Sequence, residues 1–159
     1  MLYLLLKYVH LIGAAVLLGT GAGIAFFMLM AHLTQSAVLV AGVARIVTIA
    51  DIVFTATAVV LQPVTGVLLA REAGHSLSDG WIVLSIILYL VTGAFWLPVV
   101  WMQMKMRDLA QAAAATGAPL PDRYHRLFWT WFAFGFPAFA SVLAIFWLMM
   151  ARPQIALFS

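Results

Sequence analysis

The stretch that decides the fold is the first long apolar run, residues 2–30, which reads LYLLLKYVHLIGAAVLLGTGAGIAFFMLM. Lys7 is its only Lys, Arg, Asp or Glu residue. An α-helix rises about 1.5 Å per residue, so this run exceeds the roughly 20 residues that cross a bilayer core about 30 Å thick. Because Lys7 lies well inside the run, it does not form the charged start of a signal peptide. We therefore predict a retained transmembrane helix.

Three further runs, near residues 46–70, 81–101 and 127–150, have the same apolar character. The whole chain is 66% hydrophobic and 8% charged, with a mean hydropathy of +1.12. Soluble domains carry about 25% charged residues. The sequence predicts an all-α fold, namely an integral membrane bundle of four transmembrane helices that run up-down-up-down in a single domain, residues 1–159. The 159 residues leave no room for a soluble catalytic domain.

The third helix is expected to continue out of the membrane into the cytoplasm. Residues 102–116 combine charged and amide side chains with an alanine-rich stretch of high helix propensity. Gly117 is expected to end this helix, and Pro119 and Pro121 to form the turn after it. The expected helices cover about 2–30, 46–70, 81–115 and 122–150, with residues 33–45 and 71–80 as short loops.

Basic residues predict the orientation of the bundle. Five lie in or beside the first and third loops: Arg45, Lys105, Arg107, Arg123 and Arg126. Three lie on the other side: Lys7, Arg71 and Arg152. The excess favours the first and third loops in the cytoplasm and both termini in the periplasm, for a multi-pass protein of the bacterial inner membrane. This distribution explains the net charge of +3 through topology, so nucleic acid is not an expected partner.

His10 is the strongest candidate for a functional residue, because polar side chains at membrane depth are costly and mark functional sites. It lies about two turns inside the first helix, with Lys7 three residues earlier on the same face. A neutral imidazole is the best nitrogen ligand for haem iron. An imidazole that hydrogen-bonds a neighbouring helix is an equally good interpretation. The other histidines, His32, His75 and His125, are expected to be solvated or interfacial.

The second helix holds two further polar positions. Asp51 is interpreted as an interfacial ion pair with Arg126 or Arg123, or as a partner of Gln103, and a proton relay is the alternative. Gln62 precedes Pro63, which leaves the carbonyl near Val59 without its usual donor. With alternating helices, four positions are expected to share one polar layer: His10, Gln62, residues 89–92 and Ser141. Gly19 and Gly23 form a small-xxx-small pair for close helix packing.

Four motifs resemble an uncharacterised family of predicted bacterial integral membrane proteins. They are Leu6-Lys7-Tyr8-Val9-His10, Gln62-Pro63-x-x-Gly66, Trp96-Leu97-Pro98-Val99-Val100-Trp101-x-Gln103 and Trp131-Phe132-x-x-Gly135-x-Pro137. The resemblance covers nearly the whole chain, implies four transmembrane helices and names no reaction. The Lys7-x-x-His10 start and His32 also resemble the haem-associated membrane protoporphyrinogen oxidases. That resemblance implies His10 as a haem ligand and Lys7 as a partner of a propionate, while the family's third-helix motifs have no counterpart here.

The leading functional hypothesis is a membrane redox protein that binds haem b, or is linked to quinone, in the bundle core. His10 is the expected metal ligand, and Lys7, Gln62 and Trp96 are the other expected cofactor-binding residues. The alternative is a non-catalytic assembly partner, or a bundle that binds lipid or a small solute without a cofactor. The lipid bilayer is the expected surrounding, and a quinone, a redox protein or a second copy are further candidate partners. The absence of cysteine excludes thiolate metal sites, and no hydrolase constellation is present, so the sequence assigns no enzymatic reaction.

Overall fold

The computed structural model describes residues 1–155, which form four long helices and no strand. The first is α1, Leu2–Leu33. The second runs without a break through α2 (Ala37–Ala50), the π-helix η1 (Asp51–Thr55) and α3 (Ala56–Glu72). The third and fourth are α4, Gly80–Thr116, and α5, Asp122–Ala151. All four are long and apolar enough to cross a membrane, which confirms the predicted all-helical membrane fold.

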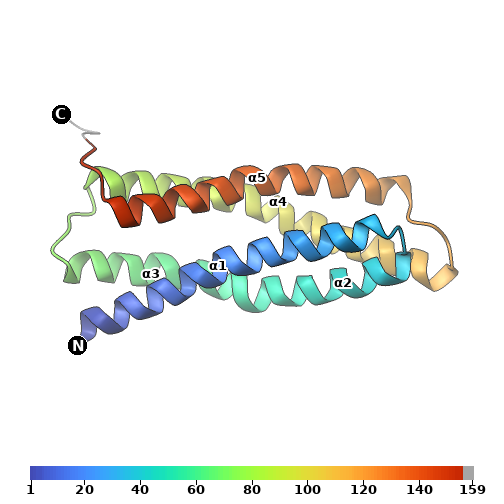
Figure 1. The fold of residues 1–159 in the computed structure, drawn as a ribbon, viewed down its shortest axis with the longest axis horizontal. Helices are drawn as coiled ribbons and strands as arrows, with labels where there is room; N and C mark the ends of the chain where they lie inside the picture. The colour runs from blue at the N-terminus through green and yellow to red at the C-terminus, as the bar shows by residue number, and fades with distance from the viewer. Residues whose placement is uncertain (156–159) are drawn as a thin grey trace.

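The chain passes back and forth along the long axis of the bundle (Figure 1). One end holds the α1–α2 and α4–α5 connections and is called the loop end here. The N-terminus and the end of α5 lie at the opposite end, together with the α3–α4 connection, and this end is called the terminal end.

The second helix begins at Ala37, so the prediction of a loop through residues 33–45 and of a helix start near residue 46 was wrong. The Ser36 hydroxyl caps the helix by accepting a hydrogen bond from the backbone N–H of Leu39 at 3.3 Å. The reversal before it is tight because Gln35 adopts a φ of 54° and its side chain donates to the His32 carbonyl at 2.7 Å. Residues 37–45 contain no proline, and the capped helix therefore extends through them.

The predicted end of the third long helix at Gly117 is confirmed. Gly117 has a left-handed φ of 66°, which a residue without Cβ adopts at no steric cost. The Ala118 N–H donates to the Ala113 carbonyl at 3.0 Å, and the Gly117 N–H donates to the Ala114 carbonyl at 3.4 Å. These two bonds form a Schellman motif that satisfies the last carbonyls of α4.

The main cluster of buried apolar side chains lies in the loop-end half of the bundle. Its fully buried side chains include Met28, Val40, Met106, Tyr124 and Phe128. Towards the terminal end, α1 packs against α3 and α4 against α5, while α3 makes few contacts with α4 or α5. The buried side chains of that half include several polar ones, namely Gln62, Thr65, Ser85 and Ser141. Two helix pairs therefore face each other there without a continuous apolar core.

Candidate functional site

His10 is held in the α1–α3 contact by a hydrogen bond between its Nδ1 and the Thr65 hydroxyl, at 2.8 Å. The Thr65 hydroxyl also lies 2.7 Å from the Leu61 carbonyl, one helical turn earlier, to which it donates its only hydrogen. With its hydrogen on that carbonyl, the hydroxyl accepts from Nδ1–H of His10. In this tautomer the lone pair is on Nε2, which has no hydrogen-bond partner within residues 1–155.

Gln62 fastens the same contact to the backbone of α1. Its Nε2 donates to the His10 carbonyl at 2.9 Å, so the expected meeting of His10 and Gln62 is confirmed. Two glycines let the helices approach at this level. A side chain at Gly13 would collide with the Gln62 amide, and a Cβ at Gly66 would lie 3.3 Å from Cε1 of His10. The close packing predicted for Gly19 and Gly23 is not found within residues 1–155: nothing lies within 4 Å of the Cβ position of Gly19, and that of Gly23 meets only Phe27 of the same helix, at 4.0 Å.

The four residues expected to bind a cofactor divide between two levels of the bundle. Lys7 lies one turn from His10 towards the terminal end, exposed, with Nζ 5.9 Å from the Tyr3 ring centroid. Trp96 instead donates from Nε1 to Oδ1 of Asp51 at 3.3 Å. Asp51 precedes Gln62 by eleven residues, which is about 16 Å along a helix axis. His10, Gln62 and Lys7 therefore form one level, and Trp96 belongs to another.

Within residues 1–155 Asp51 has no basic partner, which corrects the expected ion pair with Arg126 or Arg123. The ion pairs within residues 1–155 are His75–Asp79 and Arg107–Asp108. Asp51 is 4% exposed, and its hydrogen-bond donor from a neighbouring helix is Trp96 on α4. The expected partnership with Gln103 is also wrong, because the Gln103 amide makes no hydrogen bond. Asp51 is instead the first residue of η1, and short π-helical turns are often found at functional sites.

The carbonyl that Pro63 leaves free has the partner that the sequence required. The Tyr89 hydroxyl, on α4, donates to the carbonyl of Val59. A proline at position 63 removes the N–H that would otherwise bond to that carbonyl four residues earlier. This bond joins α3 to α4 between the levels of His10 and Asp51.

Sequence reasoning missed a buried aromatic cluster at the loop end. His32 is 5% exposed, not solvated or interfacial as expected. Its ring stacks on Phe128 with centroids 3.7 Å apart and an interplanar angle of 4°, and its Nδ1 lies 3.3 Å from the Tyr124 hydroxyl. The signal that could have revealed the cluster is the spacing of Tyr124 and Phe128, which places two aromatic rings on one face of α5.

Two further buried polar groups were also missed. Gln103 is 1% exposed, and neither its Nε2 nor its Oε1 has a hydrogen-bond partner. Trp131 is 4% exposed, and its Nε1 is also without a partner. Both residues occur in the motifs quoted above, but a single buried amide or indole gives no sequence pattern that separates it from an interfacial one.

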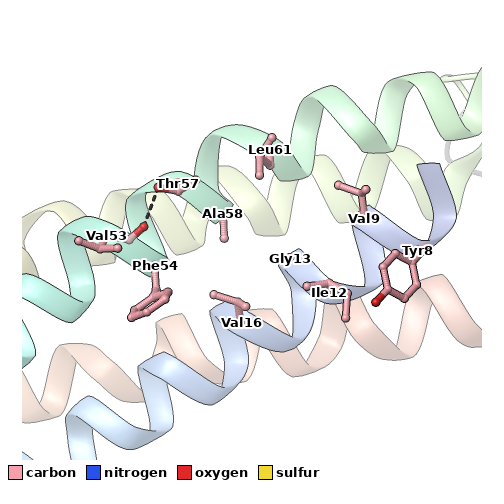
Figure 2. Close-up of a pocket in the computed structure, with 10 residues that line it drawn as sticks. All are labelled: Tyr8, Val9, Ile12, Gly13, Val16, Val53, Phe54, Thr57, Ala58 and Leu61. Carbon is pink, nitrogen blue, oxygen red and sulfur yellow. Dashed lines mark hydrogen bonds between the residues drawn. The ribbon is translucent and has the colours of Figure 1, made fainter. Parts of the chain in front are cut away.

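An apolar groove of about 310 Å³ runs between α1 and the η1–α3 segment. Figure 2 shows it between Ile12, Gly13 and Val16 of α1 on one side and Phe54 and Leu61 on the other. His10 does not line this groove. Within residues 1–155 no three His, Cys, Asp or Glu side chains come together to hold a metal ion, so a metal at this level would depend on His10 and a prosthetic group.

The family described as "Predicted integral membrane protein (DUF2269)" matches residues 4–153. The chain belongs to this family. The match agrees with the four membrane-length apolar helices, so the protein is an integral membrane protein, and the family description names no reaction. No curated protein and no solved structure matches the chain.

Proposed function

We propose that this DUF2269 protein is a membrane redox protein that binds a b-type haem through Nε2 of His10. The observation that carries the proposal is the hydrogen-bond chain from His10 Nδ1 through the Thr65 hydroxyl to the Leu61 carbonyl. Histidines that bind metal in proteins donate their second ring N–H to such a fixed acceptor, which sets the tautomer and the direction of the free nitrogen. His10 has this arrangement at a membrane depth where an imidazole is costly.

The donor set fits a haem that takes one protein ligand. Within residues 1–155 two other histidines lie in membrane-length helices. His125 is in the first turn of α5, and His32, at the far end of α1, is stacked in the aromatic cluster. The half of the bundle that contains His10 lacks the apolar core that joins the helices at the loop end. Cofactors of helical bundles lie between facing helices, so this half is the part of the fold that suits a porphyrin.

The roles of the surrounding residues follow from their contacts. Thr65 orients the imidazole. Gln62 holds the backbone of α1 through the His10 carbonyl and makes no hydrogen bond to the imidazole itself. Lys7 extends from the adjacent turn and carries the charge that would attract a propionate at the membrane boundary. Haem, when bound, supplies one-electron redox chemistry, for which a quinone or a second redox protein is the natural partner. Trp96 is too far along the bundle to belong to this site.

The test is an absorption spectrum of protein purified in detergent from haem-replete cells. We expect a Soret band that His10→Ala abolishes and that the matched variants His75→Ala and His125→Ala retain, since these two histidines lie outside the His10 level. Thr65→Val keeps the shape of the side chain but removes the hydroxyl, so it should shift the haem potential while retaining the band. A colourless wild-type protein, or a His10→Ala protein that keeps its haem, would refute the proposal.

The closed α1–α3 contact favours a second candidate, a non-catalytic membrane bundle. In that function His10 serves only to join α1 to α3, as its bond to Thr65 and its contact with Gly66 allow. A colourless protein whose thermal stability falls after both His10→Ala and Thr65→Val would support this candidate over haem binding.

A further inference from the structure

Asp51 lies in the interior of the bundle without a compensating positive charge. It is 4% exposed, and Trp96 is the side chain on a neighbouring helix that donates to it. An ionised carboxylate transferred from water into an apolar interior is stable only when it is paired or strongly hydrogen-bonded. One indole N–H to Oδ1 and the neighbouring Thr55 hydroxyl do not replace a positive charge, so the protonated form of the carboxyl group is favoured. This environment is that of a carboxylic acid group.

No charged or titratable side chain from the surrounding helices is positioned to hold Asp51 ionised. On α2 the nearest is Arg45, six residues earlier and exposed. On α4 the titratable residues nearest to Trp96 are Tyr89 and Lys105. Tyr89 is hydrogen-bonded to the Val59 carbonyl, and Lys105 is exposed. The titratable residues of α1 lie near its two ends, at positions 3–10 and 32, and α3 has none before Arg71.

Gln103 provides a polar step between Asp51 and the loop end. It lies seven residues after Trp96 on α4, which places both on nearly the same helix face about 10 Å apart along the axis. Its amide is 1% exposed with both polar atoms unpartnered, and an amide both donates and accepts hydrogen bonds. Thr48, 3% exposed, lies one turn from Asp51 in the same direction. The buried polar groups therefore continue from Asp51 towards the loop end.

From these observations we propose that Asp51 is a proton-exchanging carboxyl group in the membrane core, and that the Gln103 amide is the next polar group on its proton path, on the loop-end side. The ligand of this site is a proton, which Asp51 accepts on Oδ2 while Trp96 holds Oδ1. The exchange transfers the proton between the carboxyl group and a hydrogen-bonded path that includes the Gln103 amide. This site is independent of the His10 level and would operate whether or not the protein binds haem.

Infrared spectroscopy of the whole protein in lipid tests the proposal at neutral pH. A protonated buried carboxyl group has a carbonyl stretch separate from that of carboxylates, and this band shifts when its hydrogen exchanges for deuterium. We expect wild-type protein to show the band and Asp51→Asn to lose it. Of the other acidic residues, Glu72, Asp79 and Asp122 lie at helix ends, and Asp108 is exposed and paired with Arg107, so the difference assigns the band to Asp51.

The rate of deuterium exchange tests the route. Gln103→Met replaces the amide by an apolar side chain of similar volume, and we expect exchange to slow by about tenfold or more, because the buried polar step is lost. Gln111→Met is the matched control, since Gln111 lies exposed on the same helix and should leave the rate unchanged. If wild-type protein lacks the band, Asp51 is ionised and the proposal of a protonated, proton-exchanging carboxyl group is refuted. An unchanged rate in folded Gln103→Met protein overturns the route.

Discussion

The Tyr89 hydroxyl donates to the one carbonyl of α3, that of Val59, whose helical donor Pro63 has removed. Tyr89 and Val59 lie on different helices, 30 residues apart in the sequence. In a membrane no water is available to satisfy a free carbonyl in the apolar region, so such a bond is required for proline to be tolerated there. It also joins the two helix pairs in the half of the bundle that lacks an apolar core.

Tyr89→Phe should destabilise the protein by about 1–2 kcal/mol, because it leaves the half-buried Val59 carbonyl, in the apolar part of the bundle, without a donor. The cost should shrink when Pro63→Ala is added, since alanine restores the backbone N–H that bonds to this carbonyl. Unfolding measurements on the wild type, both single variants and the double variant form a thermodynamic cycle. Additive effects of the two substitutions would show that Tyr89 and Pro63 act independently.

Gly13→Ala should destabilise the α1–α3 contact by about 1–3 kcal/mol, because the added methyl group meets the Gln62 amide that donates to the His10 carbonyl. Gly19→Ala is the matched control. It lies two turns along the same helix, has open space at the Cβ position and gains helix propensity, so its stability should be unchanged or slightly higher. Thermal unfolding in one detergent compares them. Equal losses in both variants would contradict the role of Gly13 in the contact.

His32→Ala should lower stability by about 2–4 kcal/mol, a loss typical of truncating a large buried side chain. The ring packs flat on Phe128 and its Nδ1 lies within hydrogen-bond distance of the Tyr124 hydroxyl. Tyr124→Phe removes only the hydroxyl and should cost about 1 kcal/mol. Chemical or thermal unfolding of both variants measures the difference. A His32→Ala protein as stable as wild type would show that the cluster does not contribute to the fold.

The four long helices were predictable because an apolar run of membrane length admits few other structures. The same physics predicted the end of α4 at Gly117 and the need for a donor at the Val59 carbonyl. The start of the second long helix at Ala37 was missed although residues 37–44 are apolar, because what marks this start is the Ser36 cap. A cap is a local backbone feature that a hydropathy pattern does not contain.

The candidate site was only partly predictable, since side-chain partners depend on which helices touch. His10 and Gln62 meet because α1 packs on α3, and this pairing follows from antiparallel neighbours of equal depth. Asp51 was assigned to bases on α5 because the sequence gives depth but not rotation about the helix axis. In the structure Asp51 faces Trp96 on α4. For the same reason the sequence did not show that Gln103 and His32 face the interior and are buried.

The orientation of the bundle in the membrane follows from the position of its basic residues. Arg45, Lys105, Arg107, Arg123 and Arg126 all belong to the loop-end half of their helices (Figure 1). Segments rich in Lys and Arg remain in the cytoplasm during insertion, so the loop end should be cytoplasmic and both termini periplasmic. The chain has no cysteine, and single cysteines can therefore be introduced as unique labels at Ser78 and Thr116, which are exposed at opposite ends of the bundle. In intact cells a membrane-impermeant maleimide should label Ser78→Cys and not Thr116→Cys, and both should react after the membrane is permeabilised. Labelling of Thr116→Cys alone would reverse the orientation, and it would place the Gln103 side of Asp51 towards the periplasm.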